Sequence, residues 1–328
     1  MSSTTVSGIS ASYAGALRTA SDAASSQHYP PGALYVVATP IGNLADISLR
    51  ALHVLSLADA IACEDTRHTQ ALLRAYGIDK SLAQLLAVHQ HNEAQASLLV
   101  IDRLRLGQRV VYVSDAGTPA ISDPGARLVA AVRAQALPIV PLPGPSSITT
   151  ALSVAGITGE FSDKSGGEST RVSDGLGQFV FIGFLPAKSM ERTQAVLAMA
   201  AEPRTIVLLE APHRIEAVAN ALATLGDRRI TIGRELTKQF EEIATVRASN
   251  FSGWLAEQAN RSRGEFVLVL HPAPVVDQPG AELKVLTLLL AELPLKTAVK
   301  LAADITGAPR NTLYDAALLL KKNADASG

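Results

Sequence analysis

The stretch that most constrains this chain runs from Val110 to Gly125. Residues 110–113 form a short, mostly β-branched run that is typical of a fully buried strand. Residues 126–135 place Leu128, Val129 and Val132 on one face of a helix. The loop between them carries two glycines, two prolines and two aspartates. This order predicts an open α/β sheet with the loop at the carboxyl end of a strand, where ligands bind.

The chemistry of this loop differs from that of a phosphate-binding loop. Phosphate loops offer backbone N–H donors and positive charge, whereas Asp115 and Asp123 offer acceptors and negative charge. Such a loop suits a ligand with amines, hydroxyls or a cationic centre. For Asp123 alone a second explanation is equally good, because an aspartate before Pro124 is typical of a helix N-terminus. For the loop as a whole we predict a ligand site.

Composition limits the classes of protein to which the chain can belong. Its 328 residues, 48% of them hydrophobic, predict a globular protein with more than one domain. The formal net charge of −1 provides no bulk attraction to nucleic acid. A single cysteine, Cys63, fits a reducing compartment, so we expect a cytoplasmic protein. Residues 1–32 are rich in Ser, Ala and Thr, and we predict a disordered N-terminal tail there.

Strands and helices alternate on both sides of the central loop. The expected strands of a first domain, 33–156, cover residues 34–39, 58–63, 85–88, 110–113 and 138–142. This alternation predicts an α/β domain with a mostly parallel sheet and helices on both faces. The loops that follow these strands would meet at one edge of the sheet. We therefore expect one site to be assembled there.

Two further folded parts are expected. Residues 179–272 again alternate between strand and helix patterns and predict a second α/β domain. Residues 157–178 contain few apolar side chains and predict a linker or insert. Residues 281–322 predict a small three-helix domain of helix-turn-helix size, with Thr306-Gly307-Ala308 as a turn. Its basic and acidic residues almost balance, so the case for a basic surface is weak.

Several familiar motifs are incomplete. Lys188-Ser189 follows an expected strand, but both glycines of a nucleotide-triphosphate loop are replaced. His89, His91 and Glu93 could share one side of a strand. No further His or Cys cluster would complete a metal shell, so we expect no metal site.

Three acid-containing strings have both structural and functional explanations. Glu64 and Asp65 could form a carboxylate pair for acid–base catalysis. The simpler explanation is that Asp65 caps the next helix and Arg67 balances its charge. Glu210-Ala-Pro-His-Arg214 and Arg234-Glu-Leu-Thr-Lys238 mix acids and bases after core strands. For each residue alone a surface ion pair is the commoner explanation; for the set, a cleft is better. The acids beside Cys63 would raise its thiol pKa, which argues against a nucleophile.

Nine strings in order resemble the bacterial small-subunit ribosomal RNA (cytidine-2′-O)-methyltransferases. They begin at Val36, Cys63, His91, Ser114, Ile121, Pro141, Gly183, Glu210 and Arg234, and include Ser114-Asp-Ala-Gly-Thr-Pro119 and Gly183-Phe-Leu-Pro186. The resemblance runs from Leu34 to Leu270 and extends to the three-helix segment. It implies the tetrapyrrole-methylase fold, in which two α/β domains enclose S-adenosylmethionine. The N-terminal tail and the long linker depart from the family pattern.

The resemblance also implies roles for particular residues. Cofactor contacts are expected at Pro40, Asp115, Ala116, Gly117, Thr118, Ser122, Ser146 and Ser147. S-adenosylmethionine carries an amine, hydroxyls and a sulfonium charge, which an acceptor-rich loop suits. Candidates for a general base are Asp65, His91, His213 and Glu235, which the sequence does not rank. Candidate phosphate contacts are Arg67, Lys188, Arg214, Arg234 and Lys238.

The implied reaction is 2′-O-methylation of a cytidine ribose at the decoding centre of 16S rRNA. The partner would be 16S rRNA or the small ribosomal subunit, and a homodimer is expected for the family. Two alternatives stay open at this stage. One is a methyltransferase of the same fold that acts on a tetrapyrrole or a protein side chain. The other is a non-catalytic RNA-binding assembly factor.

Overall fold

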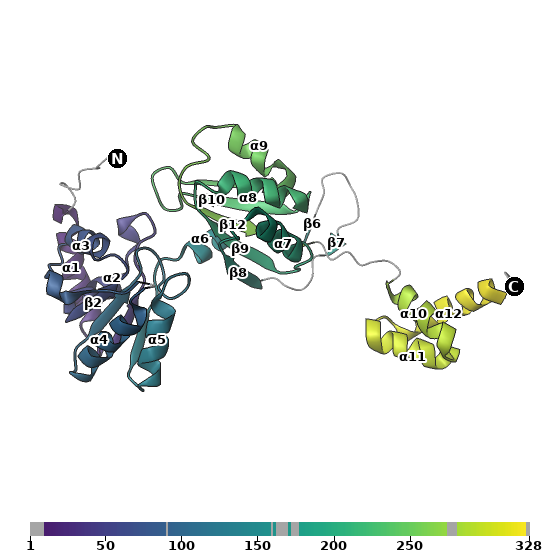
Figure 1. The fold of residues 1–328 in the computed structure, drawn as a ribbon, viewed down its shortest axis with the longest axis horizontal. Coiled ribbons are helices and arrows are strands. Elements are labelled where there is room, and N and C mark those ends of the chain that lie inside the picture. The colour runs from purple at the N-terminus through teal and green to yellow at the C-terminus, as the bar shows by residue number, and fades with distance from the viewer. Residues whose placement is uncertain are drawn as a thin grey trace. The chain divides into compact units, whose positions relative to one another are not determined.

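The loop predicted from Val110–Gly125 lies at the carboxyl edge of a five-stranded parallel sheet. The computed structural model describes residues 10–89, 91–158, 160–161, 170–171, 177–273 and 281–325. The strands of this first sheet are β1 (Leu34–Val37), β2 (Ala60–Cys63), β3 (Leu85–Ala87), β4 (Val110–Val113) and β5 (Ile139–Leu142). Their order is β3-β2-β4-β1-β5, and all four pairings are parallel (Figure 1). The predicted sheet is confirmed, with β4 at its centre.

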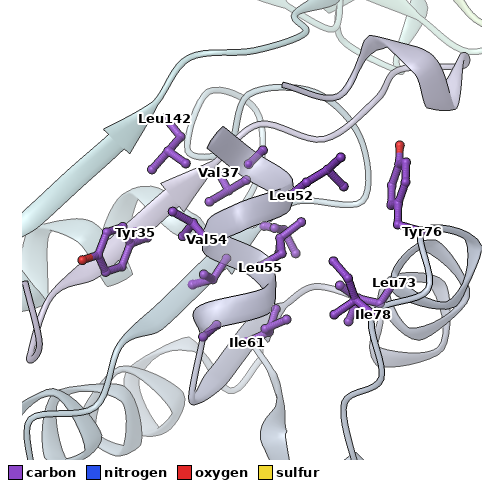
Figure 2. Packing of buried hydrophobic residues seen from close by; sticks show 14 of the residues in the cluster. Tyr35, Val37, Leu52, Val54, Leu55, Ile61, Leu73, Tyr76, Ile78 and Leu142 are labelled. Atoms are coloured by element: carbon purple, nitrogen blue, oxygen red, sulfur yellow. The ribbon is translucent and has the colours of Figure 1, made fainter. Parts of the chain in front are cut away.

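Helices cover both faces of the first sheet because every strand presents apolar side chains on both sides. The helices are α2 (Leu49–Leu57), α3 (Thr66–Ala75), α4 (Glu93–Arg105) and α5 (Gly125–Ala134), with short 3₁₀ turns at Leu44–Asp46 and Leu82–Gln84. Figure 2 shows Leu52 and Leu55 of α2 packed among Val37 of β1 and Ile61 of β2. On the other face, Val100 and Leu128 belong to a separate buried cluster. The loops after β1, β2 and β4 are therefore anchored by buried strands, whereas the edge strands β3 and β5 are partly exposed.

The prediction of a disordered tail over residues 1–32 is wrong for its described part. Residues Ser10–Ala24 form helix α1, which packs against α2. Ala20 and Ala24 are buried, and the ring of Tyr13 meets that of Tyr76 edge-on at 5.3 Å. The small alanines let the helix approach closely, and the aromatic contact adds buried area. Residues 1–9 lie outside the described residues.

A second sheet of mixed direction follows. Its strands are β8 (Phe179–Gly183), β9 (Thr205–Glu210), β10 (Arg229–Arg234), β11 (Glu242–Arg247) and β12 (Phe266–Leu270), in the order β11-β10-β12-β9-β8. Only β8 and β9 are parallel among these strands. One face packs on α7 (Ser189–Met199), α8 (Ile215–Leu222) and α9 (Phe251–Ala256), with 3₁₀ turns at Ala223–Leu225 and Ala248–Asn250.

The opposite face of the second sheet is covered by α6 (Ser147–Val154), which follows directly from β5. Ala151 and Ala155 contact Val207, Val267 and Val269 in one apolar cluster. Residues 147–154, which fall within the predicted first domain 33–156, thus pack on the second sheet. Because α6 begins at the predicted site residues, its burial links the position of these residues to the second sheet.

A buried histidine lies at the end of β12. His271 places Nε2 2.8 Å from Thr231 Oγ1 and is 4% exposed. Burial, with the charges of Arg229 and Arg228, lowers the pKa of His271 to about 4. The unfolded chain therefore takes up a proton near pH 6.5, whereas the folded protein does so only near pH 4.

We expect the free energy of unfolding to fall by up to about 3 kcal/mol from this group as the pH drops from 6.5 to 4. The stability is present above pH 6.5 and is lost as the pH falls through the lowered pKa. Trp254 in α9 is the only tryptophan of the chain, so its fluorescence reports denaturant unfolding of this sheet. His271→Gln should flatten the pH dependence; equal slopes for both proteins would contradict the assignment.

The chain ends in a separate compact unit of three helices. They are α10 (Ala281–Glu292), α11 (Leu295–Thr306) and α12 (Arg310–Asp325). Leu286, Val299 and Leu313 meet in its core. Gly307 ends α11 in a left-handed conformation at φ +73°, which confirms the predicted turn.

Most of the predicted linker, 157–178, lies outside the described residues. Within it, Glu160–Phe161 (β6) and Thr170–Arg171 (β7) form a two-stranded sheet. Among the described helices, none is long and apolar enough to cross a membrane.

Candidate active site

A cavity of about 240 Å³ opens beside the loop that follows β4. Its lining residues come from the ends of β2 and β4, from the start of α6 and from the second sheet: Glu64, Ser114, Ala116, Gly117, Thr118, Ile121, Ser122, Asp123, Ser146, Ser147, Ile148, Phe184 and Leu209. Hydroxyls and carboxylates dominate the wall from the first domain. Phe184 and Leu209 form an apolar wall from the second. The cavity thus lies where the parallel strands of the first sheet end, as the sequence predicts.

The carboxylate of Asp123 shapes the β4–α5 loop. It accepts hydrogen bonds from the Tyr112 hydroxyl at 2.9 Å, from the Gly125 N–H at 3.0 Å and from the Ala120 N–H at 2.8 and 2.9 Å. Ala120 has φ +67°, a conformation that costs energy for a residue with a Cβ. Asp123 therefore offsets local strain and fixes the cavity side of residues 116–122. It also accepts from the first turn of α5, as the helix-start explanation predicts, and it lies in the lining of the cavity.

Hydrogen bonds join the loops after β2 and β4. The Asp65 N–H donates to Asp115 Oδ1 at 3.2 Å, and the Asp115 N–H lies 3.5 Å from Glu64 Oε2. Burial and the nearby charges of Asp123 and Asp115 raise the pKa of Glu64, which the Asp115 N–H partly opposes. Cys63 is buried, and this burial is the main reason why its thiol pKa rises to about 11. The negative charges of the neighbouring acids raise the pKa further by a smaller amount. This confirms the predicted direction and places an unreactive thiol under the site.

The turn after β1 connects this loop to the second sheet. Thr39 and Gly117 exchange two backbone hydrogen bonds of 3.0 Å. A Cβ added at Gly42 would overlap the Lys238 side chain and lie 2.9 Å from Thr237 Oγ1. Only glycine allows the side chains of Thr237 and Lys238 to come this close to the backbone of the turn, so Gly42 lets the Glu235–Lys238 loop pack against the first domain.

Six of the eight predicted cofactor residues line the cavity: Ala116, Gly117, Thr118, Ser122, Ser146 and Ser147. Pro40 is buried beside the Thr39–Gly117 bridge, and the Asp115 carboxylate faces the Asp65 N–H. The sequence did not identify Glu64, Asp123, Phe184 and Leu209 as a common wall. Asp123 has two equally good explanations in the sequence, and for the Glu64-Asp65 pair the structural explanation is the simpler one. Apolar residues after strands carry no signal that separates a cavity wall from a core.

The four predicted general bases lie in the described chain but outside the residues that line the cavity. Asp65 caps α3 and pairs with Arg67 at 3.1 Å. Glu235 accepts from Lys238 Nζ at 2.8 Å and from the Glu265 N–H at 2.9 Å. His91 and His213 are exposed on turns. His89 and His91 follow β3 instead of sharing its face, and the described residues contain no cluster suited to a metal ion.

The predicted phosphate contacts differ in their surroundings. Arg67 and Lys188 are exposed, with side-chain exposures of 91% and 80%. Lys238 pairs with Glu235 and Glu265, and Arg214 with Glu210. The RNA assignment of Arg234 is wrong: its buried guanidinium donates to the carbonyls of Arg263, Asn260 and Phe240. Its guanidinium also lies 3.5 Å from a carboxylate oxygen of Glu242. A buried guanidinium engaged in this way holds loops together and is poorly placed to contact a phosphate.

Comparison with known proteins identifies the family. Residues 33–251 match the tetrapyrrole (corrin/porphyrin) methylases, and residues 277–321 match the RsmI C-terminal HTH domain. Ribosomal RNA small subunit methyltransferase I of Escherichia coli O157:H7 is 45% identical over 291 residues, or 88% of this chain and 95% of that protein. The chain belongs to this methyltransferase family. The protein of the same name from Pseudomonas aeruginosa is 44% identical over 293 residues, 88% and 97% of the two chains.

The fold of this methyltransferase also matches solved structures. A cobalt precorrin-4 methyltransferase superposes with a TM-score of 0.52 at 18% identity, covering 75% of this chain and 98% of that one. The resemblance predicted from the nine strings is confirmed, as are the fold class and methyltransferase activity. The cavity described above is the candidate active site of the methyltransferase.

Proposed function

We propose that the protein transfers a methyl group from S-adenosylmethionine to the 2′-hydroxyl of a cytidine ribose at the decoding centre of 16S rRNA. The observation that carries this proposal is the similarity to relatives named ribosomal RNA small subunit methyltransferase I. It reaches 45% identity and covers 88% of this chain and at least 95% of each relative. We also propose a cytoplasmic homodimer, as the family resemblance implies.

The cavity suits this methyl donor. When bound, S-adenosylmethionine supplies an electrophilic methyl group on a positively charged sulfur. Glu64 and Asp123 place negative charge beside the cavity, which favours a cationic ligand. The hydroxyls of Ser122, Ser146 and Ser147 can exchange hydrogen bonds with the ribose or the amino acid part of the donor, because each hydroxyl both donates and accepts. Holding the two reacting groups in line would provide up to about 7–11 kcal/mol of barrier lowering.

Glu64 is the proposed proton acceptor. It is a titratable residue of the cavity wall, and its raised pKa makes its carboxylate a stronger base than an ordinary glutamate. As the 2′-oxygen forms its bond to the methyl carbon, the carbon–sulfur bond would break and S-adenosylhomocysteine would leave with the electron pair. The proton of the 2′-hydroxyl would pass to Glu64. This choice differs from the four bases expected from the sequence, because those side chains do not line the cavity.

Ribose mapping tests the proposal directly. Mass spectrometry of 16S rRNA from cells with and without the gene should show one methylated cytidine ribose that depends on the protein. Purified protein with labelled donor should restore the mark on deficient small subunits. Label transferred to a porphyrinoid or to protein, or RNA binding without transfer, would each replace the proposal by the corresponding alternative.

Lys188 and Arg67 should contribute separate phosphate contacts. Replacing either by Ala is expected to lower RNA affinity and to reduce the slope of log affinity against log salt by about 1, because one contact fewer releases about one counterion. Filter binding over a salt series measures this slope. Arg105→Ala removes an exposed cation at the C-terminal end of α4, at the far edge of the sheet, and serves as the control. A slope equal to that of wild type would remove the residue from the RNA surface.

A further inference from the structure

The turn after β8 directs an aromatic side chain into the candidate site. The pairing of β8 with β9 is irregular between Phe181 and Gly183, and Gly183 has φ +78°. Such irregularities re-aim side chains at strand ends. The next residue, Phe184, lines the cavity and is 52% exposed. The phenyl ring therefore stands in the cavity wall and not in the core.

Hydrogen bonds from two arginines hold the backbone that follows Phe184. Arg214 donates to the Leu185 carbonyl, and Arg192 donates to the carbonyls of Pro186 and Ala187 at 3.3 and 2.9 Å. Leu185 itself is buried, at 2% exposure. The turn is thus fixed by an anchored side chain and by two arginines from α7 and the start of α8.

A buried acid holds the first of these arginines. The Glu210 side chain is 1% exposed, and its Oε1 lies 3.1 Å from Arg214 Nε. Removing a carboxylate from water is costly unless it is paired, and the Arg214 guanidinium provides the partner that offsets this cost. The link from Glu210 through Arg214 to the Leu185 carbonyl joins two of the family strings, Glu210–Arg214 and Gly183–Pro186, into one rigid support.

The cavity that Phe184 lines combines polar and apolar side chains. Ser122 and Asp123 are polar lining residues of the first domain, and Phe184 and Leu209 are apolar lining residues of the second. A flat heteroaromatic ring that also carries polar groups matches one apolar wall and one acceptor-rich wall. Stacking on an aromatic side chain is a common way of binding a base whose edges are then free for hydrogen bonds.

We propose that the Phe184 ring is a stacking platform for a nucleobase, and that Arg214 is the positioning residue that holds it. The inference rests on the proposed function, which offers two sources of this chemistry: the adenine of the methyl donor and a base of the acceptor RNA. Phe184 is then a specificity residue of the second domain. Arg214 acts through the turn and not through an RNA phosphate.

Three substitutions of Phe184 separate stacking from simple apolar contact. Phe184→Ala removes the ring, Phe184→Leu keeps an apolar side chain, and Phe184→Tyr keeps the ring. Calorimetry with S-adenosylhomocysteine, a non-reactive probe, gives donor-site affinity without RNA. Steady-state kinetics at saturating donor gives KM for small-subunit RNA. Phe179→Ala removes a phenylalanine of similar exposure, 45%, from the other end of β8 and serves as the matched control.

We expect Phe184→Ala and Phe184→Leu to weaken one of these constants about 5- to 150-fold, the range for a base stacked on one aromatic ring, with Phe184→Tyr near wild type. Weaker binding of S-adenosylhomocysteine identifies the adenine of the donor as the stacked base. A raised KM for RNA with unchanged probe binding identifies a base of the RNA. Unchanged constants in Phe184→Ala, or wild-type constants in Phe184→Leu, overturn the proposal. If wild type binds the probe but transfers no methyl group to RNA, the proposed function fails while the donor experiment still tests Phe184.

Arg214→Lys tests the positioning role. Lysine keeps the positive charge but loses the planar guanidinium that reaches the Leu185 carbonyl and Glu210 together. We expect it to weaken the same constant as Phe184→Ala, with no further loss in the double variant and an unchanged salt slope for RNA binding. A lowered salt slope with normal probe binding and KM would instead make Arg214 a phosphate contact and overturn its positioning role.

Discussion

Gly125→Ala should destabilise the first domain by about 3 kcal/mol, near the upper end of the usual cost of overpacking a core. A Cβ at this position would overlap the Tyr112 ring and lie 2.7 Å from its hydroxyl oxygen. Tyr112 cannot easily move, because it is fully buried in β4 and donates to Asp123. The methyl group would therefore push on the side chain that orders the cavity loop, and donor binding should be lost along with stability.

A double-mutant cycle tests this cause. In a Tyr112→Leu background the ring is absent, and the added methyl group should cost less than about 1 kcal/mol. The difference between the costs in the two backgrounds, about 2 kcal/mol, is a coupling of the size seen between residues in contact. Gly253→Ala is the matched control: Gly253 lies in helix α9 with no atom near its Cβ position, so the change should be neutral or stabilising by up to about 1 kcal/mol. Denaturant unfolding followed by circular dichroism gives the energies. Equal losses in both backgrounds would contradict the overlap.

The sequence predicts those parts of the structure in which local pattern and burial agree. Residues 110–113 form a strand as predicted, because a β-branched run between turn residues suits a buried parallel strand. Most residues of the β4–α5 loop that line the cavity were singled out for the same reason: glycines and acids after a core strand have few structural explanations. The parallel sheet then brings the loops together at one edge.

Other features depend on partners that are distant in sequence. Helix α1 is a poor helix by itself, and its stability comes from burying Ala20 and Ala24 against the first domain. Arg234 looks like a surface cation, but the carbonyls that engage it come from residues 240, 260 and 263. Phe184 and Leu209 resemble core residues until the fold shows which wall they form. These outcomes follow from tertiary packing, which no local pattern contains.

Glu64→Gln should lower kcat about 10²- to 10⁴-fold, the usual contribution of a general base. The amide keeps the shape of the side chain and can still accept the Asp115 N–H, but it cannot take a proton. We therefore expect the affinity for S-adenosylhomocysteine to change far less than kcat. An equal loss in both would show that Glu64 binds the donor and does not act as a base.

The pH profile provides a second readout. Glu64 must be ionised to accept a proton, so the rate of the wild-type enzyme should rise with pH through the pKa of Glu64, which burial holds above its ordinary value of 4.5. This acid limb should be absent from the residual activity of Glu64→Gln. Asp65→Asn is the matched control, because it neutralises the adjacent carboxylate, which caps α3 outside the cavity wall. If Asp65→Asn loses the acid limb and Glu64→Gln keeps it, the proton passes to Asp65, as one of the sequence-based candidates requires.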